Sequence, residues 1–271
     1  MNATERKKVE RRDSRLRSIS TGDHSAFTKE MISILEDAGR PSGLSLPETF
    51  RSFVTMAACS LSLGMREAEY LKEAERFHPN GAAHLPKAFA FLVEAMEVAD
   101  FADVLGPMHM EVSSTKAAQR DLGEFYTPWS LSRASAAMLL GTPPQIPQDR
   151  PFTLLEPASG SGGMVLAVAQ HLVDHGLSPR NMKATLIDVS PLAYEMAIIN
   201  TTLYGIPAQI IQGNALSLEV RRTSRNMHWW SAIAPGAATQ AIVAQPSAIP
   251  DYEVRYVFET VQGSFNFEVA A

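Results

Sequence analysis

The sequence predicts an α/β domain with a parallel, doubly wound sheet, preceded by an all-helical domain. Between residues 152 and 212, three short apolar runs alternate with two helical segments, and strands that alternate with helices at this spacing pair in parallel. Upstream, apolar residues recur every three or four positions, as on one face of a helix. We therefore divide the chain into a basic flexible arm (1–24), a helical N-terminal domain (25–120) and an α/β domain (121–271).

The composition is typical of a globular protein. Of the 271 residues, 45% are hydrophobic and 20% are charged, which is enough apolar surface for a sizeable core. No apolar run reaches the roughly 18 residues that span a bilayer, and the charged N-terminus lacks the apolar stretch of a secretory signal. A single cysteine, Cys59, excludes an internal disulfide and an all-cysteine metal site. These features favour a reducing, cytoplasmic compartment without membrane contact.

Charge is distributed unevenly along the chain. The formal net charge is −5, yet the first 17 residues contain seven basic and three acidic side chains. Such an arm can contact nucleic acid phosphates, or it can be a solvated, frayed terminus. The sequence leaves both interpretations open.

Four helices are predicted in the helical domain. They are expected over residues 27–38, 47–61, 65–77 and 86–101. Prolines lie at their starts or just beyond their ends, where a missing amide donor costs little. No catalytic constellation occurs in this region, so we expect the chemistry in the α/β domain.

The α/β domain is predicted to begin with a helix over residues 128–140. Strands are expected over 152–156, 184–189 and 208–212, helices over 163–175 and 191–204, and further strands over 241–244, 254–261 and 264–269. Ser190-Pro191 is a good start for the second of these helices, because serine caps free amides and proline has its ring angle preset.

A glycine-rich turn joins the first strand to its helix and is the most informative segment. It reads Leu155-Glu156-Pro157-Ala158-Ser159-Gly160-Ser161-Gly162-Gly163-Met164. Glycines let the main chain approach a ligand closely, and the following helix start offers free amide donors. Val165 stands where the usual dinucleotide fingerprint has its third glycine. By itself, the turn fits a ligand cradle and a merely tight turn equally well.

Two polar residues end the second and third predicted strands. Asp188 is placed to accept hydrogen bonds from a ribose diol, although an acid here can also cap the helix that follows. Asn214 can both donate to and accept from an adenine edge, or it can be an ordinary loop asparagine.

The order of these motifs resembles a known family. Gly123-Glu124-Phe125-Tyr126-Thr127-Pro128, the glycine-rich turn, Asp188 and Gly213-Asn214-Ala215-Leu216 follow one another as in the N6-adenine DNA methyltransferases. The likeness is closest to the modification subunits of type I restriction systems. The resemblance implies a Rossmann-like, S-adenosylmethionine-dependent methyltransferase domain behind a helical domain. It also implies DNA as a partner, and a separate specificity subunit that recognises the target.

By the same resemblance, nine residues bind S-adenosyl-L-methionine. Phe125, Tyr126 and Thr127 flank its methionine part, Glu156, Ser159, Gly160 and Gly162 belong to the glycine-rich turn, Asp188 holds the ribose and Asn214 lies beside the adenine.

The catalytic motif of that family is missing. Its members carry Asn, Asp or Ser, then Pro-Pro, then an aromatic residue, after the fourth strand. The polar residue accepts hydrogens of the weakly nucleophilic adenine amine, and the aromatic ring stacks on the flipped base. The best positional match here is Ala234-Pro235-Gly236, which offers neither a side-chain acceptor nor a ring. The catalytic residues are therefore unknown.

Other candidate sites are weaker. His171 and His175 share a helix face without an evident third ligand, which predicts a solvated face and no metal site. Trp229 and Trp230 either stack a base or pack in a core or hairpin.

Three functions are compatible with these features. The chain is an active adenine-N6 DNA methyltransferase with an atypical catalytic loop, or a catalytically silent homologue. A silent homologue acts through cofactor, DNA or protein binding, in a regulatory, antirestriction or assembly role. The third function is methyl transfer to RNA or protein, which the cofactor turn also permits.

Overall fold

The computed structural model describes Ile19 and residues 23–113 and 126–236, all of which belong to one compact unit. The basic residues of the predicted arm, the predicted boundary near residue 120 and the three predicted strands beyond residue 240 lie outside this description. The three-part division of the chain therefore stays a prediction.

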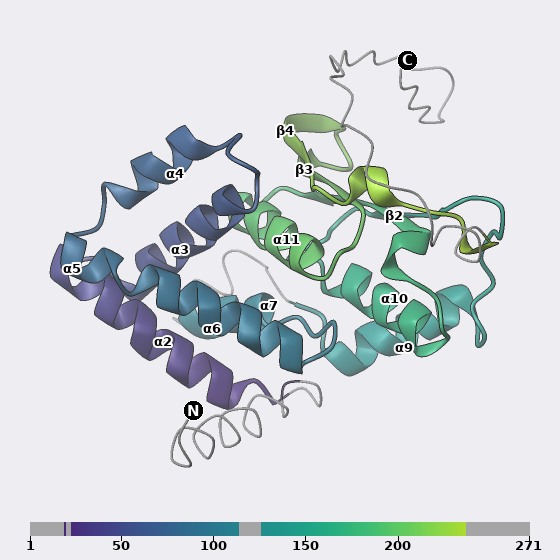
Figure 1. Ribbon diagram of the computed structural model, residues 1–271, viewed down its shortest axis with the longest axis horizontal. Helices are drawn as coiled ribbons and strands as arrows, with labels where there is room; N and C mark the ends of the chain where they lie inside the picture. Colours follow the sequence, from purple (N-terminus) through teal and green to yellow (C-terminus); the bar gives the residue numbers. More distant parts are fainter. Residues whose placement is uncertain (1–18, 20–22, 114–125, 237–271) are drawn as a thin grey trace, which may run out of the picture. The chain divides into compact units, whose positions relative to one another are not determined.

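Helices make up the first half of the described chain (Figure 1). They are α2 (Ser25–Gly39), η2 (Arg40–Ser42), α3 (Leu46–Ser60), α4 (Glu67–Ala74), α5 (Pro79–Ala82), α6 (Leu85–Val98) and α7 (Leu105–Val112). The four predicted helices are confirmed as α2, α3, α4 and α6. The prediction that the fourth reaches residue 101 was wrong, because α6 ends at Val98 and Phe101 has a φ of 53°. The short α5 and α7 were not predicted.

Local sequence explains where α3 begins. Ser45 and Glu48 form a capping box, in which the Ser45 amide donates to the Glu48 carboxylate over 2.9 Å. This reciprocal pairing satisfies amides that have no partner within the helix. The helices then share an apolar core, in which the rings of Phe27 and Phe91 stack with centroids 5.3 Å apart.

The second half forms a four-stranded sheet with helices. Its elements are α9 (Trp129–Leu140), β1 (Phe152–Glu156), α10 (Gly163–Asp174), η3 (Pro179–Asn181), β2 (Met182–Asp188), α11 (Pro191–Leu203), β3 (Ala208–Asn214), β4 (Glu219–Arg225) and η4 (Trp229–Ser231). The strand order is β1-β2-β3-β4; β1, β2 and β3 are parallel and β4 runs antiparallel to β3. The predicted α/β class and its parallel sheet are confirmed. Strand β4 was not predicted.

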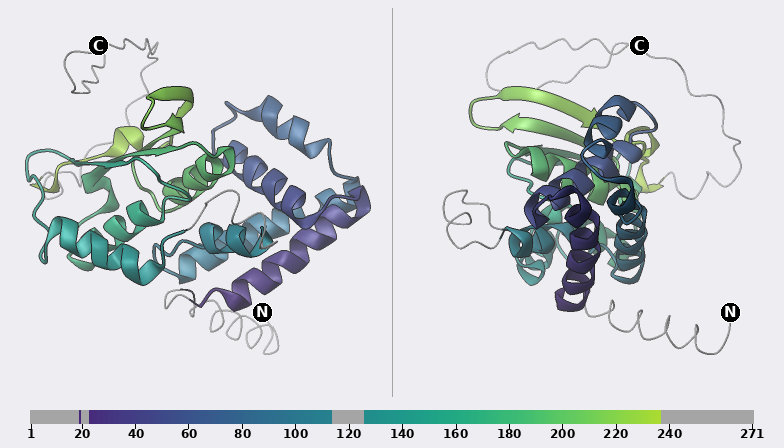
Figure 2. Two further views of the ribbon diagram at one scale, coloured as in Figure 1. Left: turned by 180° about the vertical axis from the view of Figure 1, so that it is seen from behind. Right: turned by 90° about the vertical axis from the view of Figure 1, so that its left-hand side faces the viewer.

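The two faces of the sheet differ in what covers them. Helices α10 and α11 lie on one face, where Ala184, Leu186 and Ile210 are buried in the core (Figures 1 and 2). Helix η4 lies over the opposite face. Along β1, Leu154 and Glu156 are partly buried. Leu155, which lies between them and faces the other side of the sheet, is 60% exposed. In the described structure, the face opposite α10 and α11 is therefore open at β1, whereas β3 is buried on both faces, since Gln209 and Ile211 are 7% and 8% exposed. Among those residues, no helix combines the length and apolarity that a membrane span requires.

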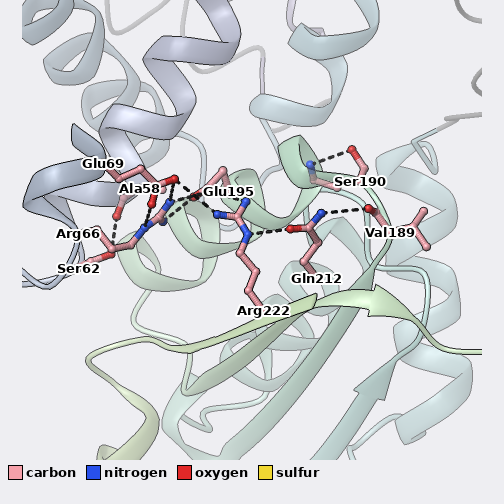
Figure 3. Close-up of polar contacts among 10 residues, drawn as sticks. Ala58, Ser62, Arg66, Glu69, Val189, Ser190, Glu195, Gln212 and Arg222 are labelled. Atoms are coloured by element: carbon pink, nitrogen blue, oxygen red, sulfur yellow. Dashed lines mark hydrogen bonds and ion pairs between the residues drawn. The ribbon is translucent and has the colours of Figure 1, made fainter. Parts of the chain in front are cut away.

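An ion-pair network joins the helical half to the sheet half (Figure 3). Both guanidinium amines of Arg66 donate to the carboxylate of Glu195 on α11, over 2.7 and 2.8 Å. Arg222 of β4 contacts the same carboxylate at 2.9 Å, and Glu69 of α4 pairs with Arg66 at 2.7 Å. The Glu195 side chain is 3% exposed, so its charge is balanced by protein cations in place of water. The hydrogen bond from Arg66 lowers the pKa of Glu69.

Glu195→Ala is expected to lower the free energy of unfolding by about 3–5 kcal/mol, because it leaves Arg66 buried without its main partner. Urea unfolding followed by circular dichroism measures this loss. Glu219→Ala is the matched control, since it breaks an exposed pair with Arg221 and is expected to cost under about 1 kcal/mol. Equal losses in the two variants would contradict the assignment of Glu195 as the centre of the network.

Candidate cofactor site at the carboxyl ends of the strands

The glycine-rich turn between β1 and α10 needs two residues with positive φ. Gly160 has a φ of 53° and Gly162 a φ of 93°, values that glycine adopts without a steric cost. The amide of Gly162 donates to the Ser159 carbonyl over 2.8 Å, and the Gly162 carbonyl accepts the first α10 hydrogen bond, from Leu166. The glycines therefore bend the chain sharply enough to start α10 directly after β1.

Asp188 holds this turn against the end of β2. The Gly160 amide donates to Asp188 Oδ2 over 2.8 Å, and the Ser190 amide donates to Asp188 Oδ1 over 2.9 Å. The Ser159 amide also donates to the Ile187 carbonyl over 3.0 Å. Each carboxylate oxygen can accept more than one hydrogen bond, so Asp188 can bind a diol while it holds the turn. The helix α11 is capped separately by the Ser190 hydroxyl, which accepts from the Ala193 amide.

Tyr126 packs against the glycine-rich turn. A Cβ atom on Gly160 would lie 3.0 Å from the Tyr126 ring, which shows how closely the ring approaches the main chain. The Tyr126 hydroxyl lies 3.2 Å from His109 Nδ1. Thr127 is exposed beside it, whereas Phe125 lies outside the described residues.

Two further polar groups of the turn, the Ser159 hydroxyl and the Glu156 carboxyl, are partly or fully buried. The Ser159 hydroxyl is buried and has no hydrogen-bond partner among the described residues. Glu156 accepts a hydrogen bond from the Ala158 amide over 3.2 Å. Burial raises the pKa of Glu156, against the effect of the Ala158 amide, and the negative charge of Asp188 raises it further. An unpaired hydroxyl and two nearby carboxyl groups provide polar contacts that a ligand can complete.

Asn214 ends β3 in a local turn. Its Oδ1 atom accepts from the amides of Leu216 and Ser217, over 2.9 and 3.2 Å. The register shift between Gln212 and Gly213 marks a bulge just before it. The side-chain oxygen of Asn214 thus shapes the loop, and no described residue accepts a hydrogen bond from its Nδ2.

The candidate catalytic segment lies at the other end of the sheet. The Ile233 amide donates to the Arg180 carbonyl over 2.8 Å, and the Gly236 amide donates to the Gln148 carbonyl over 3.2 Å. These contacts place Ala234, Pro235 and Gly236 beside the amino ends of β1 and β2. With a rise of about 3.3 Å per residue, the seven residues of β2 separate them from Asp188. The structure does not bring the segment to the glycine-rich turn.

Asp103, which the sequence analysis missed, ties the turn to the helical half. Its carboxylate accepts from the Gly106 amide over 3.0 Å, from Asn200 Nδ2 over 3.1 Å, and from the Ser161 hydroxyl. Asn200 Nδ2 also donates to the Ser161 carbonyl over 2.9 Å. Asn200 in the middle of the predicted helix was the available signal, because a buried amide requires polar partners.

The paired histidines have a structural role. His171 was predicted on a solvated face, but it is 9% exposed and its Nε2 lies 2.8 Å from the Gly141 carbonyl. That prediction was wrong because α9 packs against α10. His175 Nδ1 lies 2.8 Å from the His171 carbonyl. In the described part of the chain, no three potential metal ligands cluster.

Comparisons with known proteins identify one family. The family model described as N-6 DNA Methylase matches residues 102–243, just over half of the chain. No curated protein matches the chain.

Two solved structures are similar to parts of the chain. One, described as a class I S-adenosylmethionine-dependent methyltransferase from Listeria monocytogenes, is 15% identical with a TM-score of 0.40, and the match covers 70% of this chain and 54% of that one. The other, a type I restriction-modification system methyltransferase subunit from Streptococcus thermophilus, is 20% identical with a TM-score of 0.30, over 47% of this chain and 26% of that one. The chain thus spans about half of the first protein and about a quarter of the second.

Asp103→Ala is expected to lower the free energy of unfolding by about 2–4 kcal/mol, because it leaves the buried Ser161 hydroxyl without its acceptor and leaves Asn200 Nδ2 only its bond to the Ser161 carbonyl. Chemical denaturation measures the change. Asp100→Ala is the control, since Asp100 is exposed three residues earlier on the same loop and its removal is expected to have little effect. A wild-type midpoint for Asp103→Ala would rule out this anchoring role.

Proposed function

Because the chain belongs to the N-6 DNA methylase family, we propose that it binds S-adenosylmethionine and transfers the methyl group to adenine N6 in DNA. The observation that carries cofactor binding is the glycine-rich turn, which Asp188 holds at the carboxyl ends of β1 and β2. Ligands of parallel α/β sheets bind at this edge.

The residues of the turn fit the cofactor. The unpaired, buried Ser159 hydroxyl needs a partner, and Gly160 and Gly162, which adopt positive φ, add no side chain to the turn. Asp188 would accept the ribose hydroxyls and Asn214 Nδ2 would face the adenine. Phe125, Tyr126, Thr127 and Glu156 would line the methionine end.

The chain's own contribution to such a reaction is alignment. S-adenosylmethionine supplies an electrophilic methyl group on a sulfonium sulfur. The protein must then hold an acceptor amine in line with it, and such positioning accounts for a large part of the barrier reduction. Ala234, Pro235 and Gly236 lie at the opposite end of the sheet, so they do not supply a hydrogen acceptor for adenine from that position.

That placement favours a second candidate function, a catalytically silent homologue. Such a protein would bind the cofactor, DNA or another protein without transferring a methyl group. In either case we propose a cytoplasmic protein that contacts DNA and pairs with a specificity or other partner subunit.

Titration calorimetry with S-adenosylmethionine tests the proposed site. The wild-type chain is expected to bind, and Asp188→Ala is expected to weaken binding at least about tenfold, because it removes an ionised acceptor. Asp149→Ala is the matched control, since Asp149 is exposed and precedes the amino end of β1. No binding by the wild-type chain would refute the proposal.

Methyl transfer from labelled cofactor to DNA then separates the two candidates. N6-methyladenine in the product supports the active enzyme. Cofactor binding without any methylated base, with and without candidate partner subunits, supports the silent homologue.

The affinity for S-adenosylmethionine is expected to fall as the pH decreases through the raised pKa of Glu156. The positive sulfonium favours the ionised carboxylate, so binding is strongest above that pKa and weakens as Glu156 becomes protonated. Calorimetry at several pH values measures the dependence. S-adenosylhomocysteine, which lacks the sulfonium charge, and the variant Glu156→Gln are both expected to show a flatter profile. The same steep profile in Glu156→Gln would assign the effect to another group.

A further inference from the structure

Three cations surround the two adjacent tryptophans of η4. The Lys183 ammonium lies 4.7 Å from the centroid of Trp229, and the Arg225 guanidinium lies 5.1 Å from the same ring. Arg225 also lies 5.5 Å from the centroid of Trp230. Arg180 Nε donates to the carbonyl of Ser231, next to Trp230, over 2.7 Å. We call Arg180, Lys183, Arg225, Trp229 and Trp230 the cation–indole cluster.

The cluster is separate from the candidate cofactor site. Lys183 lies at the amino end of β2 and Arg180 lies in η3 just before it, whereas Asp188 ends the same strand. Lys183 lies in register with Thr153 of β1. Thr153 precedes Leu154, which faces α10 and α11, so Thr153 and Lys183 both lie on the opposite face of the sheet. Helix η4 lies over that face (Figure 1). A ligand held here therefore does not compete with one at the glycine-rich turn.

The positive charge of the cluster is not balanced within the described chain. No described carboxylate forms an ion pair with Arg180, Lys183 or Arg225, whereas arginines elsewhere do, among them Arg66, Arg76, Arg133 and Arg222. The Nε atom of Arg225 is buried without a hydrogen-bond partner. Burial lowers the pKa of Lys183, and the charge of Arg225 lowers it further. An anion placed beside these groups would relieve the repulsion between the two cations.

The exposed ring of Trp230 indicates which class of anion the cation–indole cluster binds. Trp230 is 61% exposed and its plane is turned by 81° from that of Trp229. Lys183 and Arg225 thus lie beside both rings, while Trp230 presents a large apolar ring to solvent. Flat rings beside cations bind unpaired bases and their phosphates together. A duplex hides its base faces, and an acidic peptide lacks them.

We propose that the cation–indole cluster binds single-stranded nucleic acid, with one base stacked on Trp230 and phosphates beside Arg180, Lys183 and Arg225. This role goes beyond the proposed methyl transfer, because it needs neither S-adenosylmethionine nor the glycine-rich turn. It also lies outside the basic segment at the start of the chain, whose phosphate contacts would be independent of Trp230.

Fluorescence anisotropy of a labelled twelve-residue oligothymidine, with the full-length chain and no cofactor, tests the proposal. Trp230→Ala is expected to weaken binding about tenfold, and Trp230→Phe, which keeps a ring, much less. Arg225→Gln is expected to weaken binding and to make its salt dependence shallower. Binding is also expected to quench the intrinsic tryptophan fluorescence of the wild-type chain.

The controls separate binding at the cation–indole cluster from a general charge effect and from a loss of folding. Arg51→Gln removes one exposed positive charge from α3 and is expected to leave binding unchanged. Because Trp230 is largely exposed, its substitution should preserve folding, which circular dichroism checks. Wild-type affinity in Trp230→Ala overturns the proposal. So does equal binding of the matching duplex, or displacement of the oligonucleotide by polyglutamate at the same charge concentration.

Discussion

The carboxylate of Asp103, in the loop before α7, accepts hydrogen bonds from the first turn of α7, from the glycine-rich turn and from α11. It therefore connects three segments that are far apart in the sequence, and the turn depends on it for its position. Ser161 and Asn200 are both fully buried, so their polar groups have no access to water if this acceptor is lost. The helical half thus helps to support the candidate cofactor site, and the family match, which begins at residue 102, includes Asp103.

The Arg66–Glu195–Arg222 network supports the same site from the other side. Arg222 donates from Nε to Gln212 over 2.8 Å, and Gln212 Nε2 lies 3.4 Å from the carbonyl of Val189, the residue after Asp188 (Figure 3). Buried charges are costly unless they are paired and hydrogen-bonded. The main effect of the network is therefore to fix the relative positions of β4, α11 and the loop after β2. Its net contribution to the free energy of unfolding is small.

The two ends of the parallel strands carry opposite charge. Glu156 and Asp188 lie at the carboxyl ends of β1 and β2, where the proposed cofactor site lies. Arg180 and Lys183 lie at the amino end of β2, where an anion is favoured. The parallel arrangement keeps the two groups apart, because β1, β2 and β3 present their carboxyl ends at one edge and their amino ends at the other.

The sequence by itself determined the longer helices, the three parallel strands and the glycine-rich turn, because periodicity, caps and positive-φ glycines are local properties; the short α5 and α7 were not among them. It also indicated the short distance from that turn to Asp188, since parallel strands align their ends. Only the tertiary structure decided the positions of Asp103, β4 and Ala234-Pro235-Gly236. Strand β4 is a polar run (Glu219–Arg225) without apolar alternation, and it is defined by pairing with β3 and by the contact of Arg222 with Glu195. Such contacts join residues distant in the chain, so no local pattern encodes them.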